Sequence, residues 1–359
     1  MRAALTRSLR VSLAAGAALS AGAGTAVALG APSPARFALA GTALAALAAV
    51  IGESVEAVGE RVGPGGTGLL QATLGNVPEL LVGIFALRRG LLEVVRAALV
   101  GSILGSCLLV LGSAFVAGGL RHGTQRFDPE EPRLYASLLL LATAALLVPT
   151  LAGHLSGPAA SHSGVLSDVC AGVLLVVYAC SVLFLLRRRA RGRAAPGEPA
   201  PPFGTPPAGL AAPVAVLLAA SGAAAAVSDW FVAALTPAIH ALGLTPTFTG
   251  LVVVAIASNA VENAVGVRFA LRAKPAYAVS TTLSSPLQIA LLLTPALVLL
   301  SPLLAPAPLT LVFPPLLVAA LGAAMVVVTA VVYDGEYTWV EGVGLVGLYT
   351  IVATAFWWG

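Results

Sequence analysis

Two acidic residues lie inside otherwise apolar segments, and similar residues precede each of them. Glu79 ends the segment 75–79 (GNVPE), and Glu262 ends the segment 258–262 (SNAVE). A carboxylate in an apolar helix at bilayer depth costs several kcal/mol unless it faces a cavity, a partner or an ion. The two glutamates are 183 positions apart in repeated surroundings, so we predict that they form one shared cation site.

An asparagine stands three residues before each glutamate, Asn76 before Glu79 and Asn259 before Glu262. On a helix this spacing places the amide and the carboxylate on the same face. Carboxylates, amide carbonyls and backbone carbonyls are the oxygen ligands that a hard divalent ion such as Ca2+ prefers. The sequence contains no cluster of Cys and His, which disfavours a soft-metal site. We therefore predict an oxygen-lined site that uses these four residues.

The same two carboxylates can also bind protons. One Ca2+ or two protons neutralise the pair equally, which is a physical basis for exchanging one for the other. Gly75 and Pro78 favour an interrupted helix beside Glu79, because glycine loosens the backbone and proline removes a hydrogen-bond donor. An enzyme would need a nucleophile paired with a base, or a metal-bound water, and the apolar segments show neither arrangement. We expect a protein that is not an enzyme and that has no cofactor.

The composition indicates a chain that is built for a lipid bilayer. Hydrophobic residues make up 58% of the 359 residues and charged residues 9%, and the mean hydropathy is +0.98. These values exceed what a soluble core of this length needs, so we predict an all-α polytopic membrane protein with the lipid bilayer as a partner. The arginines at 187–193 are typical of a topology determinant at lipid head groups, and we expect no nucleic-acid partner.

Apolar segments long enough to cross a bilayer as helices predict about 11 transmembrane helices. They cover residues 11–30, 36–58, 66–88, 94–118, 133–152, 164–187, 208–236, 246–271, 275–300, 309–333 and 338–358. With a cytoplasmic N-terminus, 15 of the 19 basic residues fall inside and only Arg36, Arg88, Arg89 and Arg96 fall outside, as the positive-inside rule requires. We therefore expect a multi-pass protein of the cell inner (plasma) membrane with its C-terminus outside. A signal peptide over 1–30 is the alternative to the first helix, and its cleavage would leave ten helices in the same orientation.

A basic, proline-rich break divides the chain into two halves. The expected parts are an N-terminal helix at 1–33, a first repeat at 34–187, a cytoplasmic linker at 188–207 and a second repeat at 208–359. The predicted helix of Glu79 runs from inside to outside, and that of Glu262 runs from outside to inside. We therefore predict two inverted five-helix repeats plus an extra N-terminal helix, an arrangement that is common in secondary transporters.

The residues around both glutamates resemble a known family, the Ca2+/H+ antiporters of the CAX branch of the cation/Ca2+ exchanger superfamily. Its first α-repeat resembles the segments 68–80 (GLLQATLGNVPEL), 86–90 (ALRRG) and 101–104 (GSIL). Its second α-repeat resembles the segments 259–262 (NAVE), 270–274 (ALRAK) and 288–291 (QIAL), and the acidic helix before the first repeat resembles 52–56 (GESVE). Two such motifs in this order are far more specific than either alone.

The resemblance implies that Glu79 and Glu262 are the central ion ligands, that access alternates, and that a proton gradient drives the export of cytoplasmic Ca2+. Second-tier candidates for the ion pathway are Glu53, Glu56, Ser102, Ser106, Asn263, Ser285 and Gln288. The alternative for Glu53 and Glu56 is a solvated acidic pair near a helix end. The alternative for Ser102, Ser106, Ser285 and Gln288 is polar packing between helices.

The second motif departs from the family pattern, which is usually Gly-Asn-Ala-Ala-Glu-His. Ser258 replaces the glycine and Asn263 replaces the histidine. A histidine at that position is a candidate for coupling transport to protons, so its absence leaves proton carriage to the carboxylates or weakens proton coupling. Na+/Ca2+ exchange is therefore the alternative to Ca2+/H+ exchange, and a non-transporting membrane protein is a less favoured alternative.

Overall fold

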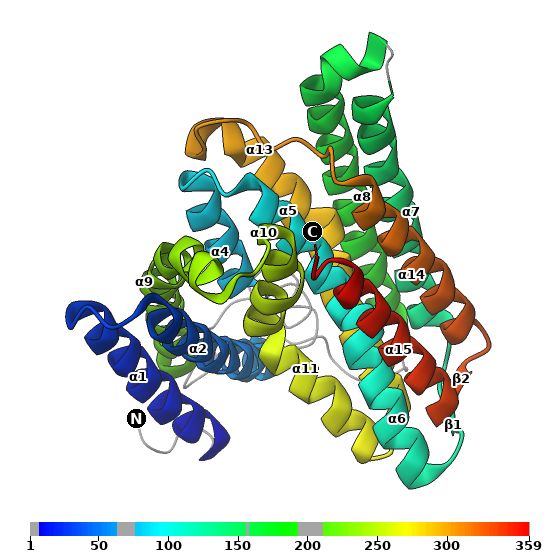
Figure 1. Cartoon of the computed structure of the whole chain (residues 1–359). Helices are drawn as coiled ribbons and strands as arrows, with labels where there is room; N and C mark the ends of the chain where they lie inside the picture. Colours follow the sequence, from blue (N-terminus) through cyan, green and yellow to red (C-terminus); the bar gives the residue numbers. More distant parts are fainter. Residues whose placement is uncertain (1–6, 63–75, 156–157, 193–210, 359) are drawn as a thin grey trace. The chain divides into compact units, whose positions relative to one another are not determined.

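The computed structural model describes residues 7–62, 76–155, 158–192 and 211–358, which are helical apart from short connections and two short strands (Figure 1). The α-helices are α1 (Arg7–Ala28), α2 (Ser33–Val62), α4 (Val77–Arg88), α5 (Leu92–Leu104), α6 (Leu111–His122), α7 (Glu130–His154), α8 (Ser163–Gly192), α9 (Ala211–Leu242), α10 (Pro246–Phe248), α11 (Ala255–Leu271), α12 (Pro275–Gln288), α13 (Thr294–Leu304), α14 (Pro315–Tyr333) and α15 (Trp339–Ala355). A 3-10 turn, η2 (Pro158–His162), precedes α8. The helical class is confirmed.

Eight helices of the described chain are long and apolar enough to cross a membrane. They cover residues 8–28, 33–55, 92–122, 130–154, 159–185, 211–242, 275–304 and 315–333. Two further predicted spans contain shorter apolar helices, Pro246–Ala257 and Trp339–Ala355. The predicted span 66–88 begins outside the described residues. A polytopic membrane protein is therefore confirmed, whereas the number of eleven helices stays a prediction.

Three of the long helices in the described part contain a π-helical segment. The segment η1 (Gly105–Val110) joins α5 to α6, η3 (Thr249–Val254) joins α10 to α11, and η4 (Ile289–Leu293) joins α12 to α13. A π-helical turn is rare and is frequent at functional sites, because its wider turn disturbs the regular backbone hydrogen bonds. The sequence predicted an irregular backbone only beside Glu79, so these three segments are additional findings.

The residues between α13 and α14 form an extended segment, which we call the strap (residues 305–314). The predicted span 309–333 begins too early, because α14 starts only at Pro315. Proline is well suited to the first helical position but disfavours a helical conformation in the residue before it. The side chains of Leu309, Leu311 and Phe313 are buried. Because these residues are apolar, the sequence pattern included them in the predicted membrane helix.

Hydroxyl groups from three helices bind the backbone of the strap. The N–H of Leu309 donates to Ser301 Oγ at 2.7 Å, that of Leu311 to Ser167 Oγ at 2.9 Å, and that of Phe313 to Thr150 Oγ1 at 3.3 Å. Non-helical backbone at membrane depth needs such partners, because the lipid offers none.

The chain divides into two compact units. One comprises residues 1–82 and 176–238, and the other comprises residues 83–175 and 239–359. Each unit draws on both halves of the sequence. The two compact units therefore do not coincide with the predicted repeats at 34–187 and 208–359, which describe similarity within the sequence. The repeats stay a prediction.

The first unit contains α1, α2 and α9, which pack on one another. A Cβ atom at Gly16 of α1 would lie 3.4 Å from Val50 Cγ2 of α2. The rings of Phe37 in α2 and Phe231 in α9 stack with their centroids 4.6 Å apart. Small and aromatic residues thus let the extra N-terminal helix α1 pack closely against its neighbours.

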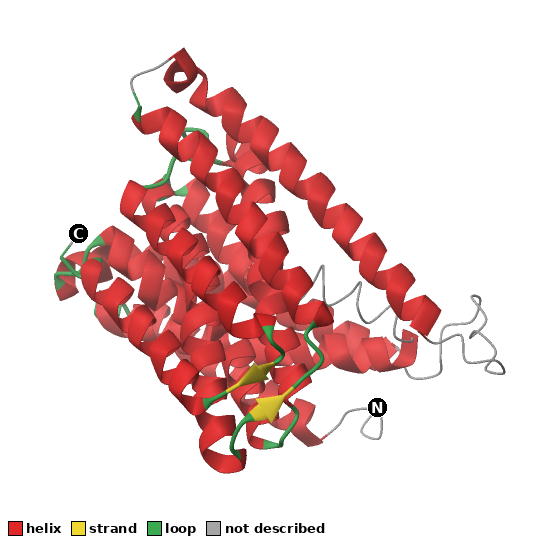
Figure 2. Ribbon diagram, turned by 90° about the vertical axis from the view of Figure 1, so that its right-hand side faces the viewer, coloured by secondary structure: helices red, strands yellow, loops and turns green. Residues whose placement is uncertain are grey.

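In the second unit, α6 lies beside α15 and α11 (Figure 1), and α7 packs against α14. The strands β1 (Gln125–Arg126) and β2 (Glu336–Tyr337) form a small antiparallel sheet, drawn as arrows in Figure 2. The sequence did not predict these strands, since two residues are too short for a periodic pattern. They join the connection after α6 to the connection before α15.

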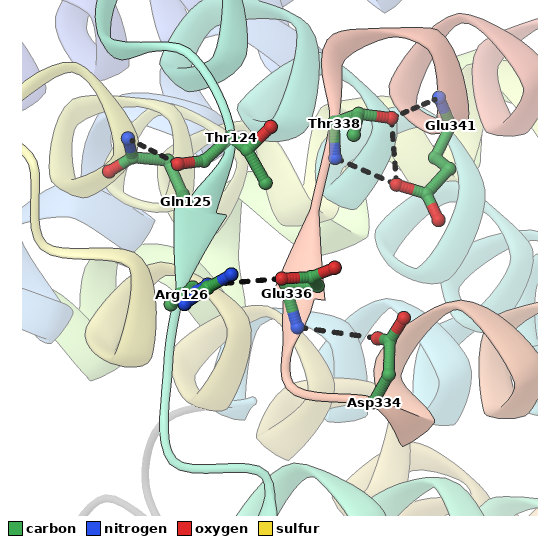
Figure 3. A network of polar contacts seen from close by, with 7 residues as sticks. All are labelled: Thr124, Gln125, Arg126, Asp334, Glu336, Thr338 and Glu341. Carbon is green, nitrogen blue, oxygen red and sulfur yellow. Dashed lines mark hydrogen bonds and ion pairs between the residues drawn. The ribbon is translucent and has the colours of Figure 1, made fainter.

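Polar contacts fix the start of α15 next to this sheet (Figure 3). Thr338 and Glu341 form a capping box, in which the Thr338 N–H donates to the Glu341 carboxylate at 2.7 Å and the Glu341 N–H donates to Thr338 Oγ1 at 3.4 Å. Such boxes satisfy the free N–H groups of a helix start. Across the strands, Arg126 pairs with Glu336 at 3.1 Å.

Candidate cation site

Glu79 lies in the first turn of α4, which begins at Val77. Pro78 occupies an early helical position, where its missing N–H costs no intrahelical hydrogen bond. The Leu80 N–H donates to the carbonyl of Asn76 at 3.0 Å, so the turn closes directly after the asparagine. The Glu79 side chain is only 8% exposed. A carboxylate at this position is stabilised by the positive end of the helix dipole.

Glu262 lies in α11, on one continuous helix with Asn259 and Asn263. The structure describes the backbone of these residues, whereas the side chains at 258–264 lie outside its described part. The three-residue step from Asn259 to Glu262 is therefore helical, as the shared-face argument requires.

A glycine follows each glutamate by four residues, Gly83 after Glu79 and Gly266 after Glu262. Four residues make about one helical turn, so each glycine lies on the same face of the helix as its glutamate. Sequence reasoning missed this feature, although both glycines are visible in the sequence.

Both glycines mark points where a neighbouring helix comes very close. A Cβ atom at Gly83 would lie 2.7 Å from Leu297 Cδ1 of α13. A Cβ atom at Gly266 would lie 2.6 Å from Thr282 Oγ1 of α12. Side chains essentially never approach so closely, so only glycine fits at these positions without a shift of the neighbours.

The helices α11 and α12 form an antiparallel hairpin in a fixed register. Gly266 faces Thr282, and one turn nearer the connection Ala270 and Ala278 belong to one fully buried cluster. Residues nearer the N-terminus of α11 therefore lie beside residues nearer the C-terminus of α12.

The helices α11 and α6 run parallel. A Cβ atom at Gly266 would lie 3.4 Å from Val110 Cγ1, the last residue of η1. At the other end of the contact, His122 Nε2 lies 3.0 Å from the Leu271 carbonyl oxygen, at the C-terminal ends of both helices. Residues nearer the N-terminus of α11 therefore lie beside residues nearer the N-terminus of α6 and in η1.

Ser106 of η1 lies four residues before Val110, and Ser285 of α12 lies three residues after Thr282, so each serine is about one turn from a residue that Gly266 approaches. Both serines are buried, at 4% and 5% exposure. Ser102 of α5, one turn before Ser106, is also buried, and its Oγ has no hydrogen-bond partner among the described residues. Gln288 at the end of α12 is half-buried. Ser102, Ser106, Ser285 and Gln288 thus lie on α5, η1 and α12, which pack against α11, and their part in the ion pathway stays a prediction.

A close crossing of α5 and η3 lies beside Ser102. A Cβ atom at Gly101 would lie 2.6 Å from Leu251 Cα, and one at Gly250 would lie 2.6 Å from the Val94 carbonyl oxygen. Backbone therefore meets backbone at this crossing, which fixes α5 relative to the helix that continues into α11.

Glu53 of α2 lies in the first unit and contacts the extra helix α1. Ser12 Oγ donates to Glu53 Oε1 at 2.8 Å, and Glu53 Oε2 is buried without a hydrogen-bond partner among the described residues. The side chain of Glu56 lies outside the described part of the chain. The carboxylate of Glu53 is partly enclosed by α1, and a role of Glu53 and Glu56 in the ion pathway stays a prediction.

Comparison with known proteins identifies the family. The model of the sodium/calcium exchanger protein family matches residues 32–187 and 212–358. A Ca2+/H+ antiporter from Synechocystis is 37% identical over 335 residues, which cover 89% of this chain and 90% of that protein. The Ca2+/H+ antiporter ChaA from Bacillus subtilis is 33% identical, with 90% of this chain and 92% of that protein covered.

A solved structure of native YfkE has the same fold. The TM-score is 0.81 at 30% sequence identity, and the alignment covers 98% of this chain and 100% of that one. The relatives are named as transporters, in agreement with a protein that is not an enzyme. The resemblance that the two glutamate motifs predicted is therefore confirmed, and the chain belongs to the sodium/calcium exchanger protein family.

Proposed function

We propose that this protein is a secondary antiporter that exports cytoplasmic Ca2+ in exchange for H+ by alternating access, with Glu79 and Glu262 as the shared site for the cation and the protons. The observation that carries the proposal is one pattern that recurs in both halves. Each copy has an asparagine, a glutamate three residues later and a tightly packed glycine four residues after that. The names of the relatives support Ca2+ and H+ as the ions.

The boundaries of the helices support an inverted repeat. The helix α4 ends at Arg88 and α11 ends at Leu271, while α5 begins at Leu92 and α12 begins at Pro275. Each pair is separated by 183 residues, as the two glutamates are. Because α4 and α11 are the third and eighth of the predicted spans, five steps apart, they cross the membrane in opposite directions, as in many secondary transporters.

The balance of charge explains the exchange of ions. Two carboxylates carry two negative charges, which one Ca2+ or two protons neutralise, and an unneutralised pair at bilayer depth is costly. The site therefore favours release of one kind of ion only as the other binds. Hydroxyl oxygens of Ser106 and Ser285 and the backbone carbonyls of the π-helical segments are suitable further ligands for a hard cation.

We place the protein in the cell inner (plasma) membrane, with the N-terminus in the cytoplasm and the C-terminus outside. The distribution of arginines supports this orientation, since only four basic residues fall on the outer side of the predicted topology. Cytoplasmic loops of membrane proteins carry such an excess of basic residues.

Na+/Ca2+ exchange is the second candidate, and Asn263 is the observation that favours it. An asparagine next to Glu262 offers an amide oxygen to a cation but cannot take up a proton near neutral pH, as a histidine does.

Transport in everted membrane vesicles loaded with a Ca2+ reporter tests the proposal. We expect Ca2+ uptake that stops when the proton gradient is dissipated, that does not depend on Na+, and that is lost in Glu79→Gln and in Glu262→Gln. The matched control is Glu336→Gln, which makes the same chemical change at an exposed ion pair of little energetic worth and should leave transport intact. Unchanged uptake in both site variants would overturn the proposed site.

A further inference from the structure

The two glycines that follow the glutamates face neighbours of different stiffness. Opposite Gly83, the nearest atoms are the terminal carbons of Leu297, Cδ1 at 2.7 Å and Cδ2 at 3.3 Å from a Cβ position. These are the far end of a flexible side chain, which can rotate away. The packing of α4 at Gly83 is therefore adaptable.

Opposite Gly266, the nearest atom is Thr282 Oγ1. This hydroxyl donates to the Ala278 carbonyl at 2.8 Å within its own helix. Threonine is branched at Cβ, so its χ1 angle has few alternatives on a helix. Thr282 is also 5% exposed and thus surrounded on all sides. The oxygen therefore acts as a fixed spacer between α11 and α12.

The spacer lies one turn from the proposed cation site. Gly266 is four residues after Glu262 on the same face of α11, and Ser285 is three residues after Thr282 on α12. Any change in the distance between the two helices at the Gly266–Thr282 contact is therefore passed to the level of Glu262 and Ser285, because each helix moves as a stiff rod over one turn.

We propose that Gly266 and Thr282 are positioning residues that set the spacing between α11 and α12 and, through it, the size of cation that the site prefers. This inference rests on the proposed function, since it assumes that Glu262 binds the cation. Ca2+ is held at 2.3 to 2.6 Å by oxygen ligands, and preference among divalent cations depends on cavity size. A displacement of a few tenths of an ångström is therefore enough to change the preference between Ca2+ and the larger Sr2+.

Two substitutions change the spacing in opposite directions. Gly266→Ala places a methyl group against Thr282 Oγ1 and forces the helices apart. We expect the KM for Ca2+ to rise on the order of tenfold, with a smaller rise for Sr2+. Thr282→Ala removes the spacer and lets the helices approach, so the preference for Ca2+ over Sr2+ should increase. In the double variant the nearest atom to the new methyl among the described neighbouring elements is Val110 Cγ1 at 3.4 Å, an ordinary contact. Both KM values should therefore return toward those of the parent protein.

The measurement is the KM for Ca2+ uptake and the inhibition of that uptake by Sr2+, in vesicles with matched amounts of transporter. Gly347→Ala is the control, because it adds the same methyl to helix α15 at a position where no other described element comes within 4 Å, and its cation preference should not change. If Gly266→Ala does not fold, Thr282→Ala still tests the predicted increase in Ca2+ preference.

The inference is overturned if neither substitution changes the ratio of Ca2+ to Sr2+ preference, or if only the maximal rate falls, as a purely structural role would predict. Glu262→Gln separates this failure from failure of the proposed function. If transport persists in Glu262→Gln, the proposed cation site itself is contradicted. Transport that is lost in Glu262→Gln, together with an unchanged cation preference in the spacing variants, contradicts only the role of Gly266 and Thr282.

Discussion

Tyr337 shows how a single residue can pack completely and still leave a polar atom unsatisfied. It is the largest fully buried side chain of the described core, and its ring stacks on Phe115 with centroids 3.9 Å apart. Its hydroxyl has no hydrogen-bond partner among the described residues. Burial raises the pKa of Tyr337 to about 12, so the hydroxyl stays neutral. The aromatic ring therefore contributes stability, and the oxygen contributes none that the contacts explain.

Replacing this residue should separate the two contributions. We expect Tyr337→Phe to leave the free energy of unfolding unchanged or to raise it by about 1 kcal/mol, because it removes a buried group without a partner. Tyr337→Ala should lower it by about 3 to 5 kcal/mol through loss of the aromatic ring and the cavity that follows. Thermal unfolding of the purified protein in detergent measures both. A clear loss of stability in Tyr337→Phe would mean that the hydroxyl has a partner.

The strap is the clearest case in which one element depends on hydroxyls from others. Thr150 of α7 does most for it: its Oγ1 accepts from the Phe313 N–H at 3.3 Å, and its one proton is shared between the Leu311 carbonyl at 3.0 Å and the Leu146 carbonyl of its own helix at 2.9 Å. Arg96 of α5 adds a bond from Nε to the Thr310 carbonyl at 3.0 Å. The extended backbone thus finds protein partners on both sides where lipid would offer none.

Thr150→Val should destabilise the protein more than the same change elsewhere on α7. It leaves the Phe313 N–H and the Leu311 carbonyl buried without their partner, which costs about 1 to 3 kcal/mol. Thr143→Val is the matched control, because Thr143 is also buried on α7 and its hydroxyl bonds, among the described residues, to the Leu139 carbonyl in its own helix alone. The midpoint of thermal unfolding compares them. Equal shifts in the two variants would show that the strap does not depend on Thr150.

At the level of elements, sequence patterns located helices better than they located irregular backbone. Apolar length alone places α7 close to its predicted span and gives the correct end of α14, because lipid requires long apolar helices. The π-helical segments were missed because they arise where helices cross, as η3 does against α5, and no local pattern encodes a crossing. The strap was missed for a related reason. Its buried leucines are as apolar as helix residues, and the hydroxyls that bind its backbone come from distant parts of the sequence.

For the whole molecule, the family and the two glutamate motifs could be predicted from the sequence. The helices that pack around the second motif, in α11, are known only from the structure. Asn76 and Glu79 could be chosen because a charged residue in an apolar helix needs a reason. Ser106 and Ser285 were second-tier candidates, and only the structure shows that each lies about one turn from a residue that Gly266 approaches. Thr282 could not have been chosen from sequence, since its role depends on a glycine sixteen residues away.

The choice of counter-ion depends on the whole transport cycle. It can be tested at Asn263, which stands where the family pattern has a histidine. Asn263→His adds a group that titrates near neutral pH next to Glu262. We expect Ca2+ uptake by this variant to depend more steeply on pH between about 6 and 8, because a second proton acceptor then joins the carboxylates. Asn263→Ala separates the gain of the imidazole from the loss of the amide. If only Asn263→His changes the pH profile, this position tunes proton coupling. If both variants keep the parent profile, the two glutamates carry the protons alone.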